Sequence, residues 1–172
     1  AVQAFRRKAY DVVIEKINEL WKVEPAHFKS YVLVGLSHTR LKNHEGEIAN
    51  YKAMVENYPE SDWAKKFLAL AYGKADKHDE AIKLFEDIHQ RRKKDWEVNL
   101  FLAKSYEAKG ETEKAIAIAR AGLEHSPHQL ALLNIAGQGL SNLERWKEAS
   151  KYVRLCYRVK PGKQTALNFM IV

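Results

Sequence analysis

The sequence has little of what marks several large classes of protein. It contains one cysteine, Cys156, among 172 residues, which excludes an intramolecular disulfide and a metal site made only of cysteines. No apolar run reaches the ~18 to 20 residues that a membrane-spanning helix requires. No segment alternates between apolar and polar residues next to hairpin dipeptides, so we expect no β-strands.

Charged residues are abundant, and cations are in excess. The chain is 46% hydrophobic, 30% charged and 10% aromatic, a balance that is typical of a folded globular protein rather than a disordered one. Lysine and arginine number 29 against 22 for aspartate and glutamate, which gives a formal net charge of +7. This excess favours acidic partners, whether protein carboxylates, anionic lipid surfaces or nucleic acid, and does not choose among them.

A period of 34 residues organises the chain. The prolines follow it, because the steps between Pro25, Pro59, Pro127 and Pro161 are 34, 68 and 34 residues. The same spacing separates Tyr72 from Tyr106 and relates Ala81, Ala115 and Ala149. Self-similarity at a fixed period of this length indicates stacked supersecondary units, and the chain is long enough for about five of them.

Each period has the pattern of two helices. Residues 66–72 and 79–88 carry apolar side chains at helical spacing. Thr112 and Ser126 are predicted N-caps, the second followed by a proline at the first helical position. Gly110 follows a lysine, which is typical of a helix end. These signals predict an all-α fold of antiparallel helix pairs.

These residues resemble the tetratricopeptide repeat (TPR) family. Its signature is a large residue, then Leu-Gly, Tyr, Ala, Phe, Ala and Pro at fixed offsets in 34 residues. Units 96–129 and 130–163 follow this signature in register, whereas unit 28–61 diverges, with His38 replacing Tyr and Glu47 replacing Ala. The resemblance implies a TPR solenoid of antiparallel helix pairs that forms a right-handed superhelix. Unit 62–95 matches the signature at Leu68, Ala69, Tyr72, Ala81, Phe85, Ile88 and Lys93.

The two ends of the sequence depart from the full repeats. Residues 1–27 are expected to form a truncated first repeat, mostly its second helix, so that the natural chain extends further N-terminally or the segment forms one longer helix. Residues 164–172 read QTALNFMIV, and we expect either a C-terminal cap or a contact for self-association or a partner. The whole is predicted to be one continuous domain.

The resemblance also implies a binding surface. In TPR proteins ligands usually lie along the concave face that the first helices of successive repeats form. The residues at these positions make a net-basic groove, suited to an extended peptide that carries carboxylates. We therefore predict a non-catalytic protein–protein interaction scaffold that self-assembles as a homo-oligomer; the alternative is a merely solvated face. The predicted peptide-binding residues are Lys29, Arg40, Trp63, Lys66, Leu70, Lys74, Leu100, Lys104, Asn134, Gln138 and Asn142.

A basic stripe on the last full second helix is a second candidate surface. Its residues, at spacings of four, three and four, are Lys147, Lys151, Arg154 and Arg158. Such a stripe suits anionic lipid headgroups or an acidic partner, or is a solvated face. The repeat count, the truncated first unit and the apolar tail directly after the last repeat make the layout similar to that of magnetosome-associated TPR scaffolds, which oligomerise around the organelle membrane. The alternative function is therefore a membrane-surface coat, and a second alternative is a regulatory fragment of a larger enzyme.

Signals for catalysis, cofactors and nucleic acid are missing from the sequence. His125 and His128 flank a Ser-Pro turn without a further ligand at metal-binding spacing. There is no Gly-rich phosphate loop and no nucleophile elbow. The basic segment 91–94 lacks the exposed aromatics that stack on bases. We expect no enzyme activity, no cofactor, no metal and no nucleic acid partner, and a cytoplasmic protein with peripheral membrane association as the alternative.

Overall fold

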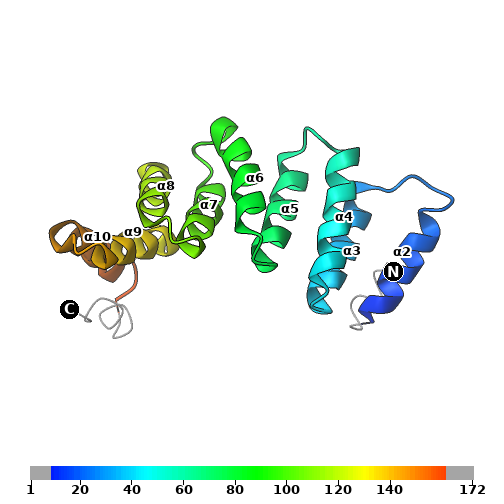
Figure 1. Ribbon diagram of the computed structural model, residues 1–172, viewed down its shortest axis with the longest axis horizontal. Coiled ribbons are helices and arrows are strands. Elements are labelled where there is room, and N and C mark those ends of the chain that lie inside the picture. The colour runs from blue at the N-terminus through cyan, green and yellow to red at the C-terminus, as the bar shows by residue number, and fades with distance from the viewer. Residues whose placement is uncertain (1–8, 162–172) are drawn as a thin grey trace. The chain divides into compact units, whose positions relative to one another are not determined.

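The computed structural model describes residues 9–161, and all of the regular secondary structure in this part of the chain is helical. It contains nine helices and no strand (Figure 1), which confirms the predicted all-α fold. Residues 66–72 and 79–88 are helical as expected. The start of the truncated first repeat and the cap or contact predicted for residues 164–172 lie outside the described residues.

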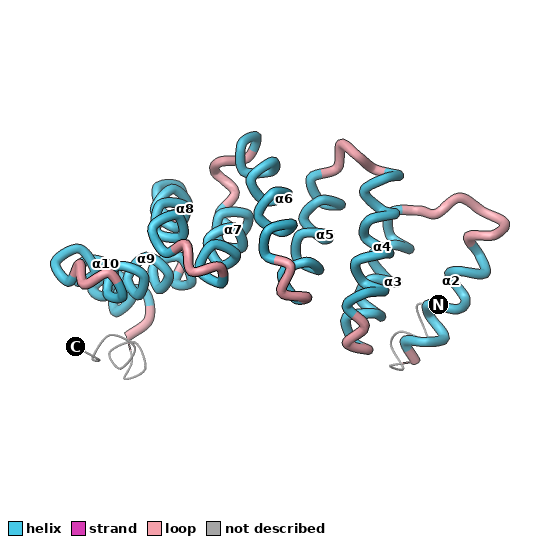
Figure 2. The backbone as a smooth tube through the Cα atoms, viewed as in Figure 1, coloured by secondary structure: helices cyan, strands magenta, loops and turns pink. Residues whose placement is uncertain are grey.

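The chain divides into two compact units, residues 1–77 and 78–172. Within each unit every helix packs on the next one in sequence, with loops between them (Figure 2). The division falls inside the predicted repeat 62–95; the repeat boundaries and the single domain stay predictions. The first unit contains α2 (Tyr10–Leu20), α3 (Phe28–Arg40), α4 (His44–Asn57) and α5 (Asp62–Lys74). The second contains α6 (His78–Arg91), α7 (Trp96–Ala108), α8 (Thr112–His125), α9 (Leu130–Asn142) and α10 (Trp146–Val159).

A left-handed turn recurs in the chain with the period of the sequence. Positive φ values of 56°, 56°, 77° and 58° occur at Lys42, Asp76, Gly110 and Glu144. The next residue in each case donates its N–H back to the preceding helix, as Glu111 does to the Tyr106 carbonyl at 2.9 Å. This is a Schellman-type helix end. The stop predicted at Gly110 is confirmed, and three equivalent turns form with a side chain in the left-handed conformation.

Two predicted helix caps are wrong. Thr112 is the first residue of α8, and Glu111 holds the N-cap position without a side-chain hydrogen bond. Ser126 is the C-cap of α8, where its N–H donates to the Gly122 carbonyl, and α9 begins only at Leu130. The Ser-Pro pair therefore follows the end of a helix, a place where proline is also common because it cannot continue the helix.

Small residues allow the helices of a pair to approach closely. In the first unit Gly35 of α3 is buried against Tyr51 of α4, and a Cβ at Gly35 would lie 2.2 Å from the tyrosine ring. Tyr51 in turn stacks on Phe67 of α5, with ring centroids 5.3 Å apart. One period later, within the second unit, Phe85 stacks on Phe101 at 6.0 Å. The same aromatic contact thus joins successive helices in each unit.

Candidate interaction surfaces

On the first helices of the first unit, exposed apolar side chains lie among cations. Trp63 of α5 is 60% exposed and Leu36 of α3 is 38% exposed, while Lys29 and Arg40 of α3 are also exposed. The Nζ of Lys66 lies 4.9 Å from the centroid of the Trp63 ring. An exposed tryptophan held beside a cation offers a partner a large apolar surface.

Lys74, predicted to face a ligand, is exposed and also forms an ion pair within the first unit. Its Nζ lies 2.7 Å from Oε1 of Glu47 and donates to Oγ1 of Thr39 at 3.1 Å. Glu47 is 1% exposed, and a buried carboxylate requires a partner. Lys66 was also predicted to face a ligand but, unlike Lys74, it is only 8% exposed. Both lysines therefore support the fold.

A polar cluster contains His38 and Glu47, the two residues at which repeat 28–61 departs from the TPR signature. Burial lowers the pKa of His38, and the charge of Glu47 opposes that shift. Burial, and secondarily Glu47, raise the pKa of Tyr51. The Nδ1 of His38 and the Oε2 of Glu47 are buried without a hydrogen-bond partner among the described residues. The first unit thus encloses titratable groups in its helix contacts.

The first helices of the second unit carry fewer cations. Lys104 of α7 is exposed, as are Gln138 and Asn142 of α9, and α7 also packs on α9. The Nζ of Lys104 lies 5.9 Å from the centroid of the Phe101 ring. Leu100 was predicted to line the groove, but it is only 8% exposed, because it packs in the interior. This face therefore offers amides and one lysine rather than an apolar anchor.

Asn134, another predicted groove residue, is directed towards α10. Its Oδ1 accepts a hydrogen bond from the Sγ of Cys156 at 3.4 Å. Cys156 is fully buried, and burial raises the pKa of its thiol to about 11. Asn134 thus links α9 to α10 inside the second unit.

The basic stripe of α10 lies open to solvent. Lys147, Lys151, Arg154 and Arg158 are all exposed, and none of the four forms an ion pair with a carboxylate within residues 9–161. Arg154 makes only a long hydrogen bond, 3.5 Å, to the Oγ of Ser150. These cations are therefore available to an external anion.

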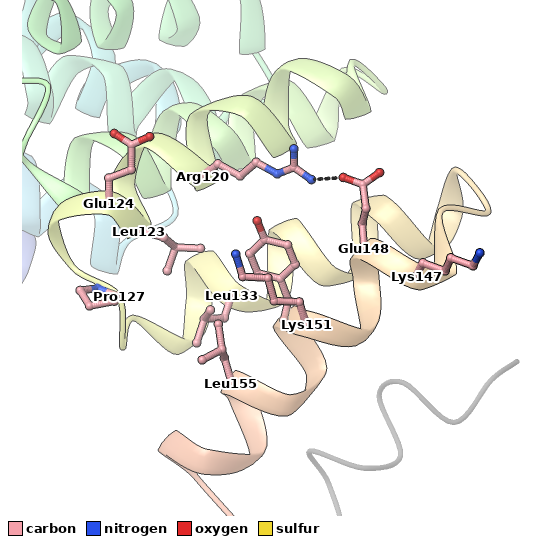
Figure 3. Close-up of a pocket in the computed structure, with 10 residues that line it drawn as sticks. Arg120, Leu123, Glu124, Pro127, Leu133, Lys147, Glu148, Lys151 and Leu155 are labelled. Carbon is pink, nitrogen blue, oxygen red and sulfur yellow. Dashed lines mark hydrogen bonds and ion pairs between the residues drawn. The ribbon is translucent and has the colours of Figure 1, made fainter.

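A hollow of about 770 Å³ lies beside this stripe, between α8 and α10. Leu123 of α8, Leu133 of α9 and Leu155 of α10 give it an apolar lining (Figure 3). Lys147 and Lys151 belong to its α10 side. Sequence reasoning identified the two lysines but missed the hollow, because its lining comes from three helices that no single repeat position relates.

An ion pair joins α8 to α10 across this hollow (Figure 3). Nη2 of Arg120 lies 2.8 Å from Oε2 of Glu148, and Nη2 of Arg145 lies 2.7 Å from the other oxygen, Oε1. Hydrogen bonds from Arg120 and then Arg145 lower the pKa of Glu148. Because both carboxylate oxygens are engaged by arginines, Glu148 does not neutralise Lys147 or Lys151.

Two kinds of feature are missing from the described residues. Within residues 9–161 no group of three or more His, Cys, Asp or Glu side chains is placed to hold a metal ion. None of the helices in that range combines the length and the apolar character that a bilayer crossing demands.

The class that this fold defines is the α-helical repeat protein. Residues 74–138 match the family model of the tetratricopeptide repeat. Over these residues the match confirms the tetratricopeptide repeat predicted from the 34-residue period. Comparison with curated protein sequences gives no match.

Solved structures share this fold over most of the chain. A crystal structure of MamA has a TM-score of 0.83 at 18% identity and covers 96% of this chain and 95% of that one. MamA from residue 41 to its end, from Desulfovibrio magneticus RS-1, has a TM-score of 0.80 at 13% identity, covering 93% and 92%. YrrB, a TPR protein with an unusual peptide-binding site, has a TM-score of 0.79 at 12% identity, covering 96% and 85%. The likeness is one of fold, and it confirms the all-α TPR solenoid.

Proposed function

We propose that this protein is a non-catalytic protein–protein interaction scaffold that binds segments of partner proteins along its first helices. The observation that carries the proposal is Trp63, which is 60% exposed on α5 although a tryptophan of a folded protein is usually well buried. Packed helix pairs present such a side chain rigidly, so the receptor loses little conformational entropy on binding. The peptide-binding site of the similarly folded YrrB supports the same reading.

The residues that contact a partner in this proposal form two sets, one in each unit. In the first unit Trp63 and the half-buried Leu70 provide apolar area, and Lys29 and Arg40 bind carboxylates. In the second unit the exposed residues are Lys104, Gln138 and Asn142, of which the two amides suit peptide backbone groups. Lys66 and Leu100 are buried behind these sets, and Lys74 and Asn134 make contacts that hold the helices in place.

A crosslinked pull-down from the source organism tests this function with two contact variants and one control. Trp63→Ala removes the exposed apolar anchor, and Lys104→Glu reverses the exposed charge on α7. The control, Lys83→Glu, makes the same charge change as Lys104→Glu at an exposed position of α6. This helix is the second of its repeat and is not part of the proposed first-helix surface. We expect both contact variants to lose specific partners while Lys83→Glu keeps them. Retention of every partner by the contact variants, with helicity unchanged, would contradict the proposal.

A second candidate function is a self-assembling coat on an anionic membrane surface. The observation that favours it is the α10 stripe, four exposed cations without a carboxylate partner in the described part of the chain. Flotation with vesicles that contain phosphatidylserine tests it: binding should weaken steeply with salt and with the Arg154→Glu/Arg158→Glu double variant. Light scattering over a range of protein concentrations tests self-assembly, which requires a mass above that of the 19.8 kDa chain.

A further inference from the structure

We propose that the hollow between α8 and α10 binds a short acidic, amphipathic segment of a partner protein. The apolar side chains of the segment enter the hollow, and its carboxylates pair with Lys147 and Lys151. The site is separate from the first-helix surfaces. The proposal rests on the scaffold function only in taking the ligand to be a segment of a protein.

The lining of the hollow explains why the segment is apolar on one side. Leu123 and Leu155 are half-buried, and Leu133 beneath them is fully buried. Figure 3 shows these leucines gathered on one side of the Arg120–Glu148 ion pair. Removing their exposed area from water stabilises a complex by roughly 25 cal/mol per Å² of apolar surface, and a volume of about 770 Å³ has room for several side chains.

The charges around the hollow explain why the segment is acidic and how it lies. Lys147 and Lys151, on the α10 side, have no carboxylate partner among residues 9–161. Glu124 is exposed on the α8 side, so a carboxylate of the ligand is repelled there. The acidic side of the segment therefore faces α10. In the preceding repeat Glu113 and Ala117 occupy the positions of the two lysines, so these cations belong to α10 specifically.

The recessed shape favours a protein segment over a membrane surface. A flat bilayer contacts the outermost cations of a helix and has no apolar group at headgroup level to fill a hollow lined by leucine. The carboxylates of Glu124 and Glu148 line the same hollow and are repelled by an anionic surface. A helix or extended segment can insert apolar side chains between α8 and α10. It can also place its carboxylates beside the lysines and away from Glu124.

Fluorescence anisotropy with a synthetic peptide tests the site. The probe is a helical peptide of about 14 residues with leucines along one side and glutamates elsewhere, and its control has glutamine at every glutamate position. We expect the glutamate peptide to bind and the glutamine peptide to bind about tenfold more weakly. Lys151→Glu and Leu155→Ser should each weaken the glutamate peptide by about tenfold, and Glu124→Gln should strengthen it by about threefold.

Three further variants separate the hollow from other surfaces. Lys83→Glu, on α6, controls for net charge and should change the affinity by less than about twofold. Arg158→Glu, further along the stripe, should have a smaller effect than Lys151→Glu. Lys151→Gln, which removes the charge without reversing it, keeps the test informative if Lys151→Glu unfolds the chain, and circular dichroism monitors folding.

The proposal is overturned if the glutamate peptide does not bind, or if Lys151→Gln and Leu155→Ser leave its affinity unchanged. It is equally overturned if phosphatidylserine vesicles bind, Lys151→Glu and Arg158→Glu weaken them alike, and the peptide fails to bind. Failure of the scaffold function gives a different result, in which Trp63→Ala and Lys104→Glu retain all partners in the pull-down while the peptide still binds at the hollow.

Discussion

The two units carry residues of opposite character at one repeat position. Near the start of the second helix, the first unit has Glu47 where the second has Ala115 and Ala149. All three are buried, but Glu47 requires Lys74 beside it, whereas the alanines require no charge. The first unit therefore pairs a groove-position lysine with its own buried carboxylate, and the second leaves the cations of the α10 stripe without a carboxylate partner among residues 9–161. A lysine's place in the repeat does not by itself decide whether it binds a partner.

The largest expected effect concerns the close helix contact of the first unit. Gly35→Ala should destabilise the protein by about 3 kcal/mol, because the new Cβ would lie 2.2 Å from the ring of Tyr51. Gly73→Ala, with nothing within 4 Å of its Cβ, should instead stabilise α5 by about 0.5–1 kcal/mol. Urea denaturation followed by tryptophan fluorescence measures both. Equal stabilities for the two variants would show that the contact is looser than described.

The next prediction breaks the charge pair that distinguishes the units. Lys74→Ala should lower the free energy of unfolding by about 2 kcal/mol, because it leaves the buried carboxylate of Glu47 without its partner. Glu47→Ala, which installs the residue of the second unit, should cost less than about 1 kcal/mol. The double variant should match Glu47→Ala in a denaturation cycle. A Lys74→Ala variant as stable as the wild type would contradict this account.

Two variants of the recurring turn should change the stability by smaller amounts, one upwards and one downwards. Glu144→Gly should stabilise the protein by about 1 kcal/mol, because glycine adopts the left-handed φ of 58° without steric cost. Gly110→Ala, at φ 77°, should destabilise it by a similar amount, about 1 kcal/mol. Thermal unfolding measures both variants. Changes of the same sign at the two positions would count against a shared turn.

The smallest expected effect is a pH dependence confined to the first unit. Burial lowers the pKa of His38, so the unfolded chain binds a proton more readily than the folded one. The stability that neutral His38 contributes is therefore fully present above its unfolded pKa, about 6.5, and is lost as the pH falls through that value towards the folded pKa. His38→Gln should flatten this part of the stability profile. A profile unchanged by His38→Gln would remove His38 as the cause.

The fold was predictable because its signals repeat. The 34-residue period locates helix pairs, and the turn at Gly110 has three equivalents that lack glycine, which the chain tolerates because the flanking helices impose the turn. The Ser126-Pro127 cap failed for a physical reason: serine and proline suit the end of one helix as well as the start of the next.

The site was less predictable because it depends on partners distant in the sequence. Lys74 is 27 residues from Glu47, and the only sequence signal for their contact was a glutamate where the repeat expects alanine. Lys66 and Leu100 occupy ligand positions by number but are buried. The hollow between α8 and α10 draws Leu123 and Leu155 from different helices, which no periodicity brings together.

The most direct test of the central claim compares Lys74→Gln with Lys151→Gln by two readouts, urea stability and affinity for the glutamate peptide. Lys74→Gln should lower the stability and leave the affinity of the folded protein unchanged, because Lys74 pairs with the buried Glu47 of the first unit and does not line the hollow. Lys151→Gln should leave the stability unchanged and weaken peptide binding. A Lys74→Gln variant that is fully stable yet binds the peptide poorly, or a Lys151→Gln variant that binds it normally, would contradict the account.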